Sequence, residues 1–207
     1  QSKINKVRNF LIKNKAEYLF VTAPENVAWI LNIRGYDSEF SPIPNARLLI
    51  NSKGNVDLFS QSKKFIKIKK KFSKKIKFHH EDKIEKKLRN LWKNNIWLDS
   101  LSCSVHFKSL LAKNNRIIQK IDPIYFFKSI KNPTEIKNMK KSHMIDGVAL
   151  TKFLFWLKKN FRKKKITEIS AQKRLENFRK MNKDYKFPSF STISGTGPNS
   201  AIIHYKA

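Results

Sequence analysis

The sequence predicts an α/β fold over residues 1–122, followed by a second region over residues 123–207 that begins with helices. Short apolar runs typical of strands alternate with helical patterns through the first region. After Asp122-Pro123 one long helical pattern begins instead. Hydrophobic residues make up 40% of the 207 residues and include 16 Phe, which is enough apolar material for a buried core.

The elements of the first region follow from apolar periodicity and from the residues that bound each run. Pro24 suits the first position of a helix, and Gly35 is expected to end that helix. The lysine-rich segment 61–77 has no clean 3.6-residue apolar stripe, which favours a solvated loop and strand over a membrane-binding helix. The expected elements are helices over 4–11, 25–33 and 84–91, strands over 18–21, 47–50, 96–99 and 117–118, and a hairpin in which the turn 52–55 leads into a strand over 56–59.

The second region is expected to contain two helices and then two strands. Thr134 is the expected cap of a long helix with one buried apolar stripe, formed by Ile136, Met139, His143, Gly147, Leu150, Leu154 and Leu157. Thr167 is the expected N-cap of the next helix, with Ile166 packing toward Ala171 and with Leu175 and Phe178 on its inner face. Strands are expected over 187–193 and 201–205, joined by a hairpin turn at 195–199.

Composition excludes several classes of protein. No apolar run approaches the ~18–20 residues of a membrane span. Cys103 is the only cysteine, so an internal disulfide is impossible and a reducing compartment is favoured. The net charge of +30 suggests a polyanionic partner, but only eight of the 45 basic residues are Arg, which phosphate recognition favours. Together with many Ile, Asn and Phe residues, this excess of Lys indicates a coding bias more than a nucleic-acid site.

Few residues in this chain suggest chemistry by themselves. Gly195-Thr196-Gly197 lacks the Lys-Ser/Thr pair and the following helix of a phosphate loop. His79-His80-Glu81-Asp82 is expected to be a solvated turn, and both Cys103 and His143 are expected to be structural. His204 ends an apolar strand beside the 195–199 turn, where an imidazole can reach the rim of a cleft. Taken alone, the residues leave a structural and a substrate-contacting role open for His204.

One stretch carries a family resemblance. It spans residues 187–205 and reads Phe187-Pro188-Ser189-Phe190-Ser191-Thr192-Ile193-Ser194-Gly195-Thr196-Gly197-Pro198-Asn199-Ser200-Ala201-Ile202-Ile203-His204-Tyr205. This stretch closely resembles the opening of the catalytic domain in the aminopeptidase P (Xaa-Pro aminopeptidase) family. Residues 22–37, 131–135 together with 139–143, and 167–170 agree with the same family in order and spacing, so the resemblance covers essentially the whole chain. Ser200 departs from the family, in which a small residue, often Gly, is usual.

The resemblance implies a fold and an activity. A creatinase-type α/β middle domain would occupy residues 1–122, and residues 123–207 would be the first helices and strands of a pita-bread catalytic domain. The family contains cytoplasmic, homodimeric metalloaminopeptidases that hydrolyse the bond ahead of proline in peptides with proline at the second position. It uses two divalent metal ions, here expected to be Mn²⁺, that activate water. No specific nucleic acid and no membrane are expected as partners.

The resemblance also assigns one residue. His204 matches the histidine that binds substrate and steadies the charge of the reaction centre, so it is the catalytic and substrate-binding candidate. The five metal ligands of the family, two Asp, one His and two Glu, all follow that histidine and are expected downstream of Ala207. Since the chain starts at Gln1 rather than Met and stops at Ala207 inside an expected strand-rich motif, we expect a fragment. Because the metal ligands are expected downstream, this fragment should bind no metal and be inactive by itself.

Two other classes of function stay open. One is a pita-bread protein that has lost its metal ligands and serves as a binding module, which the residues after Ala207 would decide. The other is a basic nucleic-acid-binding protein that uses its lysine surface. A salt titration would distinguish the latter, because phosphate contacts give a steep dependence on ionic strength.

Overall fold

The computed structural model describes residues 2–66, 68–72, 74–163 and 165–206, and the chain forms two compact units, Gln1–Ile130 and Lys131–Ala207. The division lies beyond residue 122 because the short helix α5 (Pro123–Ser129) packs on the first unit. Its Ile124 side chain is fully buried in the core of that unit. The domain limits 1–122 and 123–207 remain a prediction about how the chain folds.

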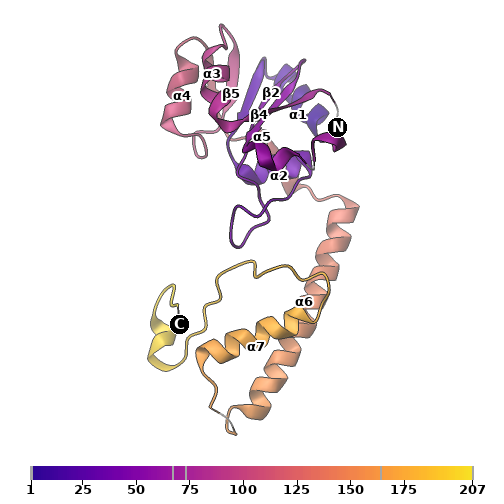
Figure 1. The fold of residues 1–207 in the computed structure, drawn as a ribbon, viewed down its shortest axis with the longest axis vertical. Coiled ribbons are helices and arrows are strands. Elements are labelled where there is room, and N and C mark those ends of the chain that lie inside the picture. The colour runs from indigo at the N-terminus through magenta and orange to yellow at the C-terminus, as the bar shows by residue number, and fades with distance from the viewer. Residues whose placement is uncertain (1, 67, 73, 164, 207) are drawn as a thin grey trace. The chain divides into compact units, whose positions relative to one another are not determined.

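Among the described residues, six strands form one sheet in the first unit, with the spatial order β4-β3-β2-β1-β5-β6. Figure 1 labels β2, β4 and β5 of this sheet. β2 pairs antiparallel with both β1 and β3, whereas the β1–β5, β5–β6 and β3–β4 pairs are parallel. The strands are β1 (Tyr18–Val21), β2 (Arg47–Asn51), β3 (Val56–Ser60), β4 (Ile76–His80), β5 (Asn95–Leu98) and β6 (Arg116–Gln119). All of the predicted strands of the first region are present, together with β4.

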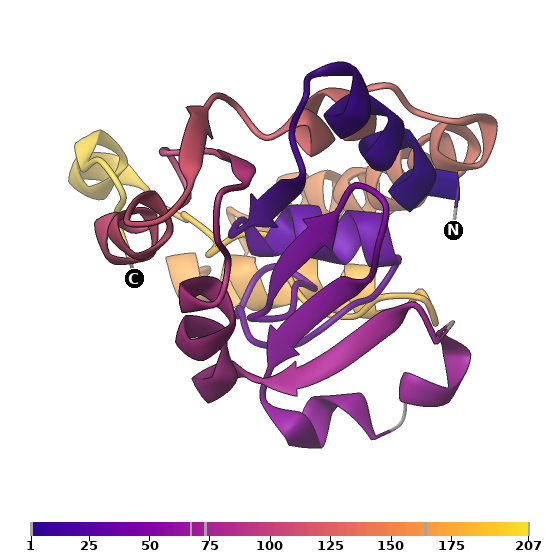
Figure 2. The same cartoon turned by 90° about the horizontal axis from the view of Figure 1, so that it is seen from above.

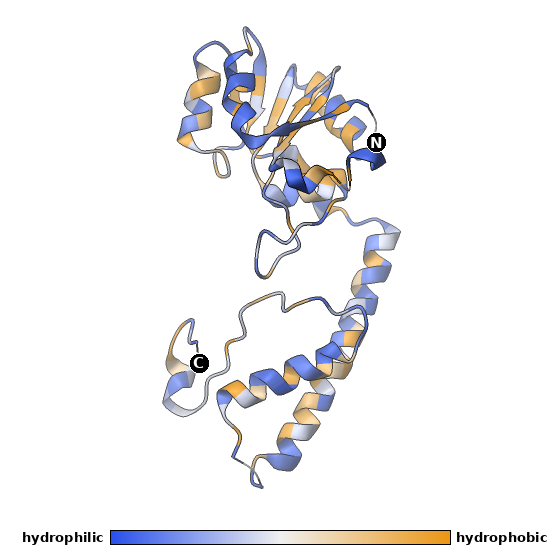
Figure 3. Cartoon of the chain, viewed as in Figure 1, coloured by the Kyte–Doolittle hydropathy of each residue, from blue (hydrophilic) through white to orange (hydrophobic). Residues whose placement is uncertain are grey.

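Helices cover both faces of this sheet (Figure 2). Successive side chains of a strand point to opposite faces, so Leu19 and Val21 pack with α1 (Ser2–Lys13), α2 (Pro24–Leu31) and α5, while Phe20 faces the opposite layer. That layer contains α3 (Ile84–Arg89), and α4 (Val105–Ala112) contributes Leu111 to it. The central strands are accordingly rich in hydrophobic residues (Figure 3). The first unit is thus a three-layer α/β/α domain, as the alternating pattern predicts.

Local details of the first unit differ from the predictions. α4 and α5 were not expected. α2 ends at Leu31 rather than near Gly35, since Asn32 adopts a left-handed conformation and its N–H bonds to the carbonyls of Ala28 and Trp29. Gly35 is needed for another reason: a Cβ there would lie 2.7 Å from the Pro44 Cα. Residues 67 and 73 of the lysine-rich segment 61–77 lie outside the described residues. The described part forms the 3₁₀ turns η1 (Ser62–Phe65) and η2 (Lys69–Lys71) before β4, which agrees with a loop and strand.

The second unit contains α6 (Pro133–Asn160), α7 (Glu168–Lys180) and the 3₁₀ turn η4 (Gly197–Ala201). Thr167 caps α7 as predicted, and its side chain and that of Ser170 bond reciprocally to each other's backbone N–H. α6 is capped by Asn132 rather than Thr134, in a capping box with Glu135. None of the described helices is both long and apolar enough to cross a membrane.

The strands predicted over 187–193 and 201–205 are wrong for this structure. Residues 187–196 have no regular secondary structure, and a 3₁₀ turn replaces the predicted hairpin turn. A strand is stable only when a neighbour accepts and donates its backbone hydrogen bonds, and the described part of the second unit offers none.

The buried stripe predicted for α6 is also wrong. Hydrophobic residues recur along the whole helix (Figure 3), so periodicity alone does not say which face a neighbour covers. α7 packs against the face that carries Ile145, Ala149 and Trp156. Most of the predicted stripe is left exposed, including Met139 (48%) and Leu154 (54%).

Candidate functional site

The segment that carries His204, residues 194–205, is bound to the first residue of α7. One Glu168 carboxylate oxygen, Oε1, accepts from the Thr196 backbone N–H at 2.6 Å, and the other, Oε2, accepts from the Tyr205 hydroxyl at 2.8 Å. Asn199 Nδ2 donates to both carboxylate oxygens at 3.2 Å and lies 3.0 Å from the Tyr205 hydroxyl. We call this set of contacts the Glu168 clamp.

The contacts of the clamp shift the titration of its members. Hydrogen bonds from the Tyr205 hydroxyl and the Thr196 N–H lower the pKa of Glu168. The same bond to the Glu168 carboxylate raises the pKa of Tyr205. At neutral pH the clamp is therefore a carboxylate that accepts from a neutral phenol, the stronger kind of hydrogen bond.

His204 lies beside the clamp, with an exposed side chain directly before Tyr205. Its backbone has φ = +56°, in the left-handed region that residues other than glycine rarely adopt. Such conformations persist only where the surroundings hold them, and they cluster at functional sites. The structure thus places His204 in a constrained turn rather than at the end of a strand.

Glu168 was missed by the sequence reasoning. The signal was available, since Glu168 follows the N-cap Thr167 inside one of the stretches that match the aminopeptidase P family. Asn199 likewise lies in the turn that was assigned only a conformational role. What the sequence did not show is that these residues meet, because they are 31 positions apart.

His143 is not the interior histidine that was predicted. It is exposed on α6, with Nδ1 2.9 Å from the Met139 carbonyl oxygen one turn earlier. The prediction placed it on the stripe that α7 does not cover. His143 therefore gives no support to either a core or a ligand role.

His79 is not a solvated turn residue either. It lies in β4, with Nε2 2.6 Å from Asp57 Oδ1 and its ring stacked on Phe59. Lys87 Nζ from α3 is 3.1 Å from the second Asp57 oxygen. Since Asp57 is buried in β3, this cluster ties the edge strand and α3 to the sheet and has a structural purpose.

Cys103 is buried, and burial raises the pKa of its thiol to about 11. A thiol with that pKa is protonated at neutral pH and is a poor nucleophile. The structural role expected for Cys103 fits this environment.

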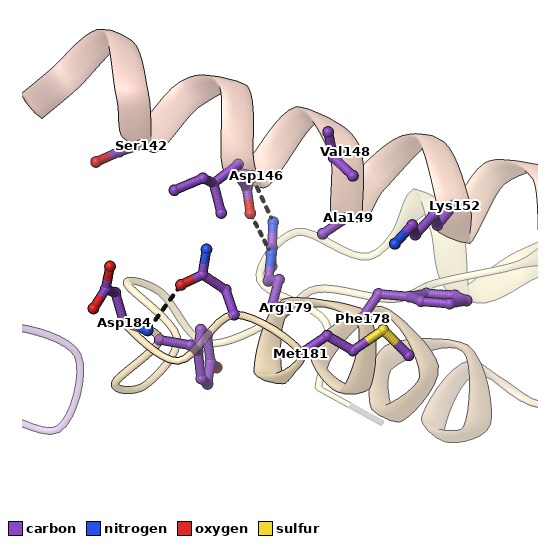
Figure 4. Close-up of a pocket in the computed structure, with 12 residues that line it drawn as sticks. Ser142, Asp146, Val148, Ala149, Lys152, Phe178, Arg179, Met181 and Asp184 are labelled. Atoms are coloured by element: carbon purple, nitrogen blue, oxygen red, sulfur yellow. Dashed lines mark hydrogen bonds and ion pairs between the residues drawn. The ribbon is translucent and has the colours of Figure 1, made fainter. Parts of the chain in front are cut away.

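A pocket of about 430 Å³ lies between α6, the C-terminal part of α7 and the turn that follows it (Figure 4). Arg179 donates to both Asp146 oxygens, from Nε at 2.6 Å and from Nη2 at 3.1 Å. This bidentate pair links the two helices across the pocket (Figure 4). Neither Glu168 nor His204 lines the pocket, so it is separate from the clamp.

The described residues do not provide a metal site. Within 2–66, 68–72, 74–163 and 165–206, no three His, Cys, Asp or Glu side chains gather closely enough to hold an ion. Both carboxylate oxygens of Glu168 accept hydrogen bonds from donors of the protein itself.

Both units match models of known protein families. Residues 1–135 match the model of the Creatinase/Prolidase N-terminal domain, and residues 137–207 match that of Metallopeptidase family M24. The chain therefore belongs to the creatinase/prolidase family, and it continues into the beginning of an M24 metallopeptidase domain. This order of domains is the one that the sequence resemblance implied.

Individual relatives agree with the family match. The chain is 34% identical over 210 residues to Xaa-Pro aminopeptidase 1 of Dictyostelium discoideum, covering 99% of this chain and 33% of that protein. It is 35% identical over 207 residues to Xaa-Pro aminopeptidase ApepP of Drosophila melanogaster, covering 96% and 33%. The chain spans about a third of the length of these curated relatives.

Solved structures show the same fold. One is the X-prolyl aminopeptidase of Caenorhabditis elegans, described as a cytosolic enzyme with a di-nuclear active site. The match covers 99% of this chain and 35% of the C. elegans chain, with a TM-score of 0.87 and 25% sequence identity. The Xaa-Pro dipeptidase of Bacillus anthracis matches 87% of this chain and 48% of its own with a TM-score of 0.64 at 16% identity. At that identity the second match supports the fold alone.

Proposed function

We propose that this chain is part of a Xaa-Pro aminopeptidase, an enzyme that removes the residue ahead of proline from the N-terminus of a peptide. The observation that carries the proposal is the near-complete match of the chain to the two relatives that bear this name, at 34% and 35% identity. The C. elegans enzyme supports it with the highest structural similarity quoted above. The substrates would be peptides with proline at the second position.

The proposal includes the parts that the described residues do not contain. Two divalent ions, with Mn²⁺ as the expected metal, would be bound by Asp, His and Glu residues that follow Ala207 in the longer protein. Metal ions at such a centre polarise the scissile carbonyl and activate water. We further propose a cytoplasmic homodimer. The compartment is supported by the similarity to the cytosolic C. elegans enzyme, and the homodimer is what the family resemblance implies.

His204 is the residue of this chain proposed to touch the substrate. Its imidazole is exposed and can donate a hydrogen bond to the carbonyl oxygen of the first residue of the peptide. A donor already in place stabilises the negative charge that develops on this oxygen as the carbonyl is attacked. His204 would thus act on both substrate binding and the transition state.

The test is an assay of the longer protein that contains this chain. With Mn²⁺ present it should cleave a Xaa-Pro peptide and leave the matching Xaa-Ala peptide intact, and a chelator should abolish the cleavage. His204→Ala should lower kcat/KM by about 10²–10³-fold at unchanged metal content, as expected for the loss of one oxyanion donor. The 207-residue chain alone should show no cleavage.

His143→Ala is the matched control, because His143 is an exposed histidine in the same unit. It should leave kcat/KM unchanged and alter stability by no more than about 0.5 kcal/mol, as surface substitutions do. Absence of any cleavage by the metal-loaded protein would favour the binding-module alternative. Normal kcat/KM in His204→Ala would remove His204 from the site.

A further inference from the structure

Glu168 joins the 194–205 segment to a helix whose position is itself fixed. α7 begins in the Thr167–Ser170 capping box and is tied to α6 by the Arg179–Asp146 ion pair. The Ser194 hydroxyl adds a bond of 3.0 Å to the Glu168 carbonyl oxygen, so both the backbone and the side chain of Glu168 hold the segment. The clamp is therefore anchored on regular structure, which holds a side chain more closely than a loop does.

Apolar packing does little to hold the same segment in place. Within it, Ile202 is 53% exposed and Ile203 85%. The polar contacts of Glu168 reach both sides of the turn, at Thr196 and Asn199 before η4 ends and at Tyr205 after it. Among the described contacts, those of Glu168 thus tie the segment to α7.

We propose that Glu168 is a positioning residue that fixes the 194–205 segment on the first turn of α7 and thereby sets the position of the His204 imidazole. What His204 then does rests on the proposed function, whereas the clamp itself does not. Tyr205 is the neighbour of His204, so the bond from its hydroxyl to the carboxylate restrains the backbone directly beside the imidazole.

The left-handed backbone of His204 explains why a restraint is needed. This conformation costs an L-residue free energy, and the residue relaxes when its surroundings no longer impose it. Loss of the carboxylate should free Tyr205 and let His204 sample other conformations. A displacement of the imidazole by about 1 Å is enough to cost up to about 10²-fold in rate.

The clamp is tested first without any assay of activity, in the 207-residue chain. In Glu168→Ala, the Thr196 amide should exchange with solvent at least about 10-fold faster, since it loses its acceptor. The pKa of Tyr205, followed by NMR of tyrosine labelled at Cζ and assigned with Tyr205→Phe, should fall toward its ordinary value of about 10. Glu176→Ala is the matched control: it removes a carboxylate from the same helix that contacts Lys180 and Tyr185 instead.

The positioning role is tested in the longer, metal-loaded protein. Glu168→Ala should lower kcat by about 10–100-fold with little change in KM or metal content. Glu168→Gln should recover part of the loss, because its carbonyl oxygen still accepts from the Thr196 N–H. Tyr205→Phe, which leaves α7 and its cap intact, should give a smaller loss in the same direction.

The outcomes separate the inference from the proposed function. If Glu168→Ala showed the same Thr196 exchange rate and the same Tyr205 pKa as Glu176→Ala, the clamp would be overturned, whether or not the protein is a peptidase. Altered exchange with normal kcat would overturn the positioning role. A loss of kcat that only parallels a loss of folded protein, with no recovery in Glu168→Gln, would show a merely structural role. If the wild type cleaves nothing, the proposed function fails and the exchange and titration still decide the clamp.

Discussion

In the first unit a sheet is covered by helices on both faces, whereas in the second unit two helices and a segment of irregular backbone are joined largely by polar contacts. Among the described residues beyond residue 130, Ala149 is the only buried hydrophobic residue. The first unit holds two apolar clusters, one on each face of its sheet. The comparison teaches that the first unit closes a core by itself, while the second keeps much apolar surface uncovered.

The largest expected difference between the units is in hydrogen exchange. Amides of β1, β2 and β3 should exchange only through global unfolding, because these strands are buried on both faces. Amides of α7 should exchange at least about 10³-fold faster through local opening. Native-state exchange of the 207-residue chain, read by mass spectrometry, measures both. Equal protection of α7 and the central strands would refute the contrast between the units.

Truncation of a leucine to alanine should lower the free energy of unfolding much more in the first unit than in the second. Leu58 is fully buried in β3, so Leu58→Ala should cost about 2–5 kcal/mol of unfolding free energy through lost burial and a cavity. Leu154 is 54% exposed on α6, so Leu154→Ala should change stability by no more than about 0.5 kcal/mol. Urea unfolding followed by circular dichroism compares the two variants. A large cost for Leu154→Ala would mean that another surface covers this face of α6.

A smaller effect concerns the buried polar groups of the first unit. Burial raises the pKa of Asp122 to about 6, although hydrogen bonds from the Ile124 N–H and Asn26 lower it. Asp99 opposes its ionisation and Lys128 favours it. Because this folded-state pKa lies above the unfolded value, the folded protein binds more protons, and Asp122 makes stability fall as pH rises from about 4 to 6.

The magnitude follows from the size of the shift. A shift of about two pKa units corresponds to about 2–3 kcal/mol over that pH range. Asp122→Asn should flatten this part of the profile, because an amide does not titrate. Urea unfolding of the wild type and the variant at pH 4, 5 and 6.5 measures the difference. If the stability of the wild type and that of Asp122→Asn changed equally with pH, Asp122 would not bind the additional proton in the folded state.

The sequence predicted much of the first unit and less of the second. Strands β1, β2 and β3 and helices α1 and α2 were found because their apolar patterns match the faces that they bury. α4 and α5 were not found, although α4 is as long as α2. In α5 the apolar residues 124–127 are contiguous, so no helical period is visible there. His204 stood out beside the 195–199 turn, but only the family resemblance favoured a substrate-contacting role for it. Glu168 was missed because its partners are distant in sequence.

By itself the sequence determined the α/β class of the first unit, the caps that start α7, and the family to which the chain belongs. These properties depend on local spacing and on short motifs, which a linear sequence contains in full. Only the tertiary structure decided which face of α6 is covered, since that depends on where α7 packs. It also decided that Glu168 meets Thr196, Asn199 and Tyr205, because such a contact exists only once α7 and the 194–205 segment lie side by side.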